Sequence, residues 1–327
     1  MSSDFDICIV AQAGRLSYEA VLFAASLRKA APGFTGKLIV GEPQPGPLWK
    51  EDPRIEPDAR ELLDTFGATI LPFQSLHFGA SYPHGNKVEM LAAMEPERPF
   101  LFFDTDTLIT GPIEELKIDF AVPSASMARE NTWPVIPLYG PSLADIWQAV
   151  FDRAGVDMAP TLDPSQPDGY WERHLYFNAG WFYYKCPRVF ASRMIELMVS
   201  LRDRPPEELA CQSFDPWLDQ IALPVVIAGL GGGRPGDNLD GLDGDLSLHW
   251  RALPLLYGTA PDGIIDFIEE IAAPNKVKKV LKAYEPFKRL LYQSRGHKVR
   301  ALFDQKALPK TEKAIRNRIK RNNLWMR

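Results

Sequence analysis

The chain has 327 residues, of which 46% are hydrophobic and 24% are charged, and its formal net charge is −5. This length allows about two domains or one large one, and the composition is typical of a soluble globular protein. The sequence argues against a membrane-spanning helix, a secretory leader and a disulfide framework. No apolar run reaches about 18 residues, the chain starts MSSDFD, and only three cysteines are present. We therefore expect a cytoplasmic location.

The first part of the chain alternates short apolar runs with segments of helical spacing. The helices expected here lie at residues 13–30 and 84–94, and the strands at residues 6–11, 37–41, 68–73 and 99–109. Strands that alternate with helices favour a parallel sheet, and continuous apolar runs indicate that helices cover both of its faces.

The second part continues this pattern, with helices expected at residues 146–154 and 188–201 and strands at residues 119–125, 176–184 and 223–230. The predicted fold class is therefore α/β, with a mostly parallel sheet flanked by helices. In such a sheet, ligands gather beyond the carboxyl ends of the strands. Polar clusters follow three of the predicted strands, at residues 12–15, at 104–107 and from 231 onward.

The sequence Asp104-Thr105-Asp106 follows a buried apolar strand and is the most informative motif. Mg²⁺ and Mn²⁺ prefer oxygen ligands, often one or two carboxylates together with substrate phosphates. Asp104 and Asp106 are therefore candidate metal ligands that would bridge to a diphosphate, and Thr105 between them is a candidate residue for binding the same ligand. A turn with helix-capping acids is the alternative, because an isolated motif of this kind is common.

The segment LFFDTDTLITGPIEEL resembles the Asp-x-Asp segment of GT-A-fold glycosyltransferases, in particular the retaining family that includes glycogenin and bacterial lipopolysaccharide galactosyltransferases. Three other segments fit that family in the same order: Lys87 in the preceding helix, Asn178-Ala179-Gly180 in YFNAGWFYY, and Asp219-Gln220 in DPWLDQIAL. The resemblance covers residues 6–257. It implies a GT-A-like enzyme that moves a sugar from a nucleotide diphosphate donor to a glycan, lipid or protein acceptor, with Mn²⁺ or Mg²⁺.

The resemblance also implies a role for each segment. Lys87 would lie near the phosphates or the sugar, and residues 178–180 would line the sugar pocket. Asp219 would accept hydrogen bonds from sugar hydroxyls, and Gln220 would lie on the β face of the anomeric carbon, which makes both candidate catalytic residues. If the reaction retains configuration, as in the resembled family, no strong nucleophile is apparent beside the anomeric carbon, so a front-face mechanism through an ion-pair-like state is expected.

His249, in LSLHWR, is the candidate third metal ligand, because members of this family often supply a late histidine. A histidine with a purely structural role is the alternative. His77, His84 and His174 rank below His249 as ligands.

The end of the first strand is expected to touch the nucleotide base or ribose. The residues concerned are Ala11, Gln12 and Gly14, and Tyr18 is expected to stack on the base. Gln12 stands where the resembled family usually has an acidic residue or an asparagine, so the identity of the base stays open.

Other functions fit parts of the sequence. Asp104 could be the nucleophile of a haloacid dehalogenase-like phosphatase, but that motif usually ends the first strand, and here about a hundred residues precede it. Sugar-phosphate nucleotidylyltransferases share the fold but need a basic, glycine-rich first loop, which is nearly absent here. A non-catalytic nucleotide-sugar-fold binding protein is a further alternative. Phosphate release or metal-dependent donor hydrolysis would separate these functions.

The C-terminal part has its own composition. Residues 275–327 hold 17 lysines and arginines against three acidic residues, whereas the residues before them hold 20 basic and 39 acidic ones. We therefore predict a catalytic domain at residues 1–260 and a basic helical extension at residues 261–327, in which Ile315 and Ile319 share a helix face. Such a helix can lie on an anionic membrane surface, and the expected salt-sensitive binding would be lost on deletion after Pro274.

Helices packed on the acidic body, or a solvated end, are the alternatives for the extension. No nucleic-acid partner is expected, because the basic segments lack the aromatic and basic motif of a known module.

Overall fold

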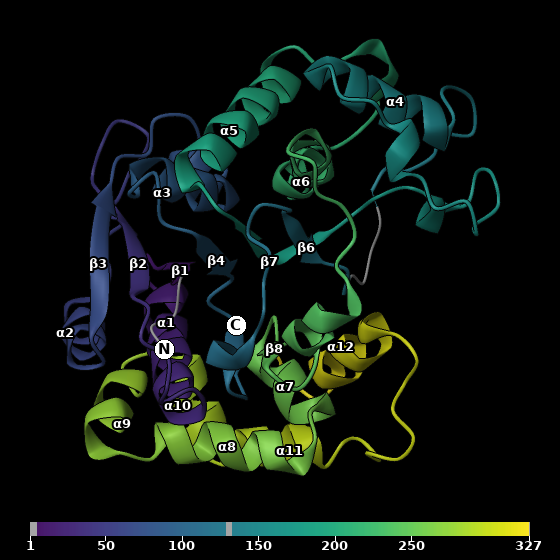
Figure 1. The fold of residues 1–327 in the computed structure, drawn as a ribbon. Helices are drawn as coiled ribbons and strands as arrows, with labels where there is room; N and C mark the ends of the chain where they lie inside the picture. The colour runs from purple at the N-terminus through teal and green to yellow at the C-terminus, as the bar shows by residue number, and fades with distance from the viewer. Residues whose placement is uncertain (1–4, 129–132, 327) are drawn as a thin grey trace.

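The computed structural model describes residues 5–128 and 133–326. Within these residues a six-stranded sheet has the order β3-β2-β1-β4-β7-β6, and a separate two-stranded sheet pairs β5 with β8 (Figure 1). The strands are β1 (Asp6–Val10), β2 (Leu38–Pro43), β3 (Ala68–Phe73), β4 (Phe100–Phe103), β5 (Thr107–Ile109), β6 (Ser124–Ser126), β7 (Asn178–Tyr184) and β8 (Ser247–His249). The pairs among β3, β2, β1 and β4 are parallel, and β7 pairs antiparallel with β4 and β6. The predicted α/β fold with a mainly parallel sheet is confirmed.

Helices cover both faces of the six-stranded sheet (Figure 1). One face carries α3 (Asn86–Ala93), α4 (Leu143–Ala154), α5 (Pro187–Asp203) and α6 (Leu218–Gly229). The other carries α1 (Arg15–Ala30), α2 (Pro57–Thr65), α7 (Leu253–Thr259), α8 (Asp262–Ala272), α9 (Asn275–Leu281), α10 (Glu285–Tyr292), α11 (Arg295–Arg300) and α12 (Glu312–Arg321).

The period of two along each strand divides the apolar side chains between two hydrophobic cores. In β1, Ile7 and Ile9 belong to the core with α1, whereas Cys8 belongs to the core with α3 to α6. In β4, Leu101 and Phe102 divide in the same way. Because successive side chains of a strand point to opposite faces, an uninterrupted apolar run is what a sheet with two covered faces requires.

The expected strand at residues 223–230 is wrong, because these residues belong to α6. Leu223, Val225 and Ile227 are fully buried, and the helix is apolar on nearly all sides because it lies between the sheet, α4 and α5. A short apolar run has no period that separates a buried helix from a buried strand. The polar cluster from residue 231 onward therefore follows a helix and does not mark a strand end.

Two other predicted strands have different bounds. The run at residues 99–109 is divided into β4 and β5, which lie in different sheets, because the chain turns at residues 104–106. The expected strand at 119–125 is reduced to β6, whose pairing with β7 is irregular between Ala125 and Ser126.

The basic extension packs on the body. Leu281, Leu290, Val299 and Ile319 are fully buried, in the same core as α1, and Ile315 is 6% exposed. The expectation that the apolar face of α12 lies on a membrane is therefore corrected, since this face is covered by protein. Deletion after Pro274 would open this core, so it does not test membrane binding cleanly. The division into residues 1–260 and 261–327 stays a prediction.

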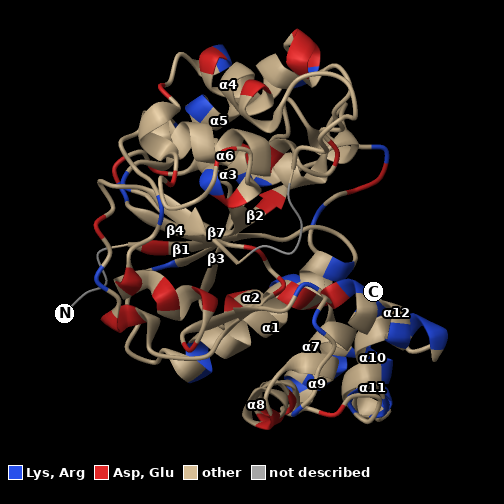
Figure 2. Ribbon diagram, turned by 90° about the vertical axis from the view of Figure 1, so that its right-hand side faces the viewer, with Lys and Arg blue, Asp and Glu red and all other residues tan. Residues whose placement is uncertain are grey.

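Among the described residues, no helix combines the length and the apolarity that crossing a membrane requires. Most basic side chains of α12 are nevertheless exposed, namely those of Lys313, Arg318, Lys320 and Arg321. Figure 2 shows Lys and Arg gathered on α12, beside the C-terminal end of the chain.

Candidate active site

A cleft of about 510 Å³ opens beyond the carboxyl ends of β1 and β4. Ligands bind at this position in open α/β sheets, and small-molecule sites usually measure about 300–1,000 Å³. The cleft is the point at which the separate sequence motifs meet. Nine predicted residues line it, namely Gln12, Lys87, Asp104, Thr105, Asp106, Asn178, Asp219, Gln220 and His249.

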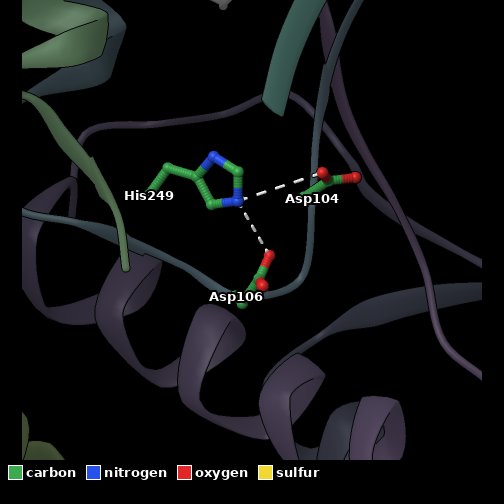
Figure 3. A group of neighbouring side chains, drawn as sticks. All are labelled: Asp104, Asp106 and His249. Atoms are coloured by element: carbon green, nitrogen blue, oxygen red, sulfur yellow. Dashed lines mark hydrogen bonds and ion pairs between the residues drawn. The ribbon is translucent and has the colours of Figure 1, made fainter. Parts of the chain in front are cut away.

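Asp104, Asp106 and His249 form a compact cluster (Figure 3). One ligand atom of each lies within 4.8 Å of the others. His249 Nε2 is 3.1 Å from Asp106 Oδ1 and 4.0 Å from Asp104 Oδ2. A divalent cation between these atoms would gain two carboxylate oxygens and one imidazole nitrogen, a donor set that can hold a divalent cation. The residues present therefore fit the predicted metal.

Strand pairing brings His249 to the two aspartates. β8 runs antiparallel to β5, and His249 pairs with Thr107, the residue after Asp106. The Trp250 backbone N–H donates to the Asp106 carbonyl at 2.8 Å, which extends this pairing by one bond. The ligand positions are therefore held by backbone hydrogen bonds on both sides of the turn.

Gly180 leaves room for His249. A Cβ atom at this position would lie 2.5 Å from His249 Nδ1, closer than carbon and nitrogen can approach. The Gly180 carbonyl also accepts a hydrogen bond from the Asp104 backbone N–H at 2.8 Å. The structure thus places Gly180 behind the metal cluster, outside the cleft lining, together with its neighbour Ala179.

Burial and neighbouring charges shift the pKa values of His249 and Asp104. Burial lowers the pKa of His249, but the neighbouring Asp106 and Asp104 carboxylates outweigh burial and raise it overall. Burial raises the pKa of Asp104, and repulsion from Asp106 adds to this, against the opposing effect of Lys87. Two carboxylates in one poorly solvated site favour a bound cation.

Lys87 lies between the cluster of Asp104, Asp106 and His249 and the predicted catalytic residue Asp219. Its Nζ lies 3.0 Å from Asp104 Oδ1 and 3.0 Å from Asp219 Oδ2. Burial lowers the pKa of Lys87, but the two carboxylates outweigh it, so the pKa is raised well above its usual value. Burial raises the pKa of Asp219, whereas Lys87 and His84 lower it, and the net change is downward. Lys87 is therefore charged and Asp219 ionised.

Asp219 and Gln220, at the start of α6, are each held by a tyrosine. The Tyr82 hydroxyl lies 2.8 Å from Asp219 Oδ1 and accepts the Asp219 backbone N–H at 3.0 Å. Tyr82 is 6% exposed, and its pKa is strongly raised, first by burial and then by the Asp219 charge. The Tyr176 hydroxyl donates to Gln220 Oε1 at 3.0 Å. These contacts fix both side chains beside the cleft.

Asn178, at the start of β7, is fixed by two hydrogen bonds. Its Nδ2 donates to the Ala128 carbonyl at 2.8 Å, and its Oδ1 accepts the Gly180 backbone N–H at 2.9 Å. Thr105 is 4% exposed, and its hydroxyl lies 3.4 Å from Glu19 Oε2. Both side chains line the cleft with little freedom to turn.

The predicted nucleotide-binding residues divide between the cleft and its support. Gln12 lines the cleft and accepts a hydrogen bond from Asn86 Nδ2 at 3.1 Å. Ala11 is fully buried at the end of β1, and Gly14, with φ +79°, donates its N–H to Glu56. Tyr18 lies outside the cleft lining, since its ring stacks on Tyr284 at 5.2 Å. Tyr18 is therefore in a poor position to stack on a base in the cleft.

Of the lower-ranked histidines, only His84 lines the cleft. His174 is 3% exposed and stacks on Trp147, and His77 contacts Phe78. Sequence reasoning missed several charged residues of the cleft. Arg15 is the last residue of the first polar cluster but received no role, whereas Arg251, Glu312 and Arg316 are brought here only by the folding of the C-terminal part.

The family to which the sequence belongs defines the class of protein. Residues 7–231 match the family described as the Rhodobacterales glycosyltransferase domain. This chain belongs to that family, and the glycosyltransferase resemblance of its motifs is confirmed. A phosphatase with Asp104 as nucleophile and a non-catalytic binding protein are set aside, the former also because the motif ends the fourth strand of the chain.

Several solved structures are similar to this chain. The galactosyltransferase LgtC, in complex with donor and acceptor sugar analogues, is 15% identical over 71% of this chain and 73% of that chain, with a TM-score of 0.41. The bifunctional glycosyltransferase WbbM is 13% identical over 86% of this chain and 52% of its own, with a TM-score of 0.44. The apo form of GlyE from Streptococcus pneumoniae TIGR4 is 13% identical over 82% and 51%, with a TM-score of 0.38. No curated protein matches the chain.

Proposed function

We propose that this glycosyltransferase takes its sugar from a nucleotide diphosphate donor, depends on Mn²⁺ or Mg²⁺, and retains the configuration of the anomeric carbon. The observation that carries this proposal is the cluster of Asp104, Asp106 and His249 at the cleft. A bound cation would neutralise the charge that develops on the departing nucleotide diphosphate. An acceptor of the glycan, lipid or protein class would enter the same cleft.

The residues around the cluster have separate roles in this proposal. Lys87 and Asn178 hold the donor near the cation, and Gln12 contacts the nucleoside. Asp219 accepts hydrogen bonds from sugar hydroxyls, while Gln220 lies beside the anomeric carbon. Because Asp219 is committed to Lys87 and Tyr82, it is a poor nucleophile, which supports a front-face reaction.

Donor hydrolysis without an added acceptor tests the proposal. We expect the melting temperature of the protein to rise when Mn²⁺ and one member of a panel of nucleotide sugars are both added. Ligand binding stabilises the folded state by mass action. The same donor should be hydrolysed slowly, and chelation of the metal should stop the reaction. Hydrolysis that is unaffected by chelation would contradict the metal dependence.

We also propose that the exposed basic face of α12 binds an anionic membrane surface, so that the protein is peripheral to the membrane. This face includes Lys313, Lys320 and Arg321, all exposed, on the side opposite the buried Ile315 and Ile319. Near-surface basic residues contribute about 1 kcal/mol each to such binding.

Vesicle sedimentation tests the membrane proposal. The wild type should bind vesicles that contain phosphatidylserine, and high salt should weaken the binding. The triple variant Lys313→Gln, Lys320→Gln, Arg321→Gln should lose most of it at an unchanged melting temperature, since none of the three side chains is buried. Equal binding of both proteins, or equal binding to neutral vesicles, would refute a basic membrane face.

A further inference from the structure

Three charged side chains of the cleft lie outside residues 7–231 and outside the metal cluster. Arg251 follows β8, and Glu312 and Arg316 lie one turn apart on α12. Glu312 stands between the two arginines. Arg251 Nη1 is 2.9 Å from Glu312 Oε2, and Arg316 Nη2 contacts Glu312 Oε1. The C-terminal helix is thus part of the cleft wall.

One carboxylate between two guanidinium groups leaves a net positive charge at this wall. The Glu312 side chain is 16% exposed, so its charge is largely withdrawn from water, whereas Arg316 is 38% exposed toward the cleft. Arg316 Nε is buried and finds no hydrogen-bond partner among the described residues. Its guanidinium lies 5.2 Å from the centre of the Trp325 ring, which restrains the plane of the group.

The other basic side chains of the cleft, Lys87 and Arg15, already pair with acidic residues at or near the candidate metal ligands. Lys87 bridges Asp104 and Asp219, and Arg15 contacts Glu19 and lies 3.8 Å from Asp106. Arg316 differs because its acidic partner, Glu312, is outside that cluster and is shared. A ligand oxyanion could therefore approach Arg316 without displacing a predicted metal ligand.

We propose that Arg251 and Arg316 form a phosphate-binding pair that Glu312 orients, and that α12 thereby completes the substrate site. The pair would take phosphate oxyanions, since a guanidinium offers a planar fork of donors that matches phosphate geometry. The phosphate comes either from the donor diphosphate or from a phosphorylated acceptor. This inference rests on the proposed donor chemistry for its biological meaning, although the anion site can be measured by itself.

Calorimetry with Arg316→Gln tests the pair. Pyrophosphate is titrated into the Mn²⁺-loaded protein, and inorganic phosphate into protein that is already saturated with Mn²⁺ and pyrophosphate. A charge-assisted hydrogen bond contributes about tenfold or more to affinity, so the variant should bind one of these anions at least about tenfold more weakly. Arg316→Lys should recover part of the loss, because it restores the charge without the fork.

Arg318→Gln is the matched control, since it removes the same charge from an exposed position of the same helix that lies outside the cleft lining. Weaker pyrophosphate binding in Arg316→Gln alone assigns the pair to the donor diphosphate. Weaker binding of the second anion alone assigns it to an acceptor phosphate. If Arg316→Gln and Arg318→Gln both bind the two anions as the wild type does, or if both variants weaken anion binding equally, the proposal is overturned.

The outcome is separable from the donor proposal. If Arg316→Gln weakens anion binding but the protein hydrolyses no nucleotide sugar, the phosphate pair is supported and the donor chemistry is refuted. If the protein hydrolyses the donor but Arg316→Gln binds anions as tightly as the wild type, only the phosphate pair is refuted. Melting temperatures of all variants identify any loss of folding.

Discussion

Replacing Asp106 with asparagine is expected to lower Mn²⁺-dependent donor hydrolysis by at least about a thousandfold. Asp106 lies 3.1 Å from His249 Nε2 and is 8% exposed, and among the described residues the cluster contains only one other carboxylate, that of Asp104. Asparagine keeps the shape of the side chain but loses the charge that attracts the cation. The hydrolysis rate measures the loss of activity, and calorimetric titration of Mn²⁺ with and without donor measures the loss of cation affinity.

The effect of this variant on folding should be small. Asp106→Asn removes the repulsion between Asp106 and Asp104, but it also weakens the attraction of Asp106 to His249 and Arg15. The melting temperature without metal should therefore stay close to that of the wild type. Asp64→Asn is a control at an exposed position on α2. Metal-dependent donor binding that survives in Asp106→Asn would remove Asp106 from the site.

Lys87→Met should cause a larger loss of stability than any single substitution on the exposed surface. The change leaves the buried Asp219 and the half-buried Asp104 near each other without their shared cation. Breaking a buried ion pair by removing one partner costs about 3–5 kcal/mol, because an uncompensated charge remains. Urea unfolding at pH 7 without metal measures this loss. Lys50→Met, at an exposed position, should change the free energy of unfolding by less than about 0.5 kcal/mol.

The pH dependence of Lys87→Met follows from the direction of each pKa. In the wild type, the folded-state pKa of Asp219 is lowered, so its contribution to stability is present above the unfolded pKa and is lost as pH falls through the folded value. Without Lys87, burial dominates and raises the pKa of both acids in the folded state. The folded variant then binds more protons than the unfolded chain, and its deficit should shrink as pH falls from 7 to 5. A deficit that is constant over this range would show that the two acids are not left unpaired.

The sequence predicted those features that depend on local pattern. The apolar runs of β1 and β4 identify buried strands, and the Asp104-Thr105-Asp106 motif marks the acidic residues that follow β4, although not the turn that ends it. Lys87, Asn178 and Asp219 were reached through the resemblance to a family, and the cleft brings all three together. Their roles in the reaction stay predictions.

Features that depend on tertiary packing were not predictable in the same way. The run at residues 223–230 is apolar because α6 is enclosed by other elements, and burial on all sides erases the helical period. The basic extension has the amphipathic pattern that also suits a membrane surface, and only packing shows that protein covers Ile315 and Ile319. Arg316 joins the cleft through contacts with residues distant in the sequence, so no local signal marks it.

The pairing of β5 with β8 also bears on when the enzyme becomes active during its synthesis. It joins His249 to Asp106, which lie 143 residues apart in the sequence. Domains generally begin to fold as they leave the ribosome, N-terminal part first. A nascent chain that already holds β1 to β5 has two of the three candidate ligands and an incomplete cleft, and Arg316 arrives only with α12. We therefore expect donor turnover to start only after α12 has been made, which would protect the cell from sugar transfer by unfinished chains.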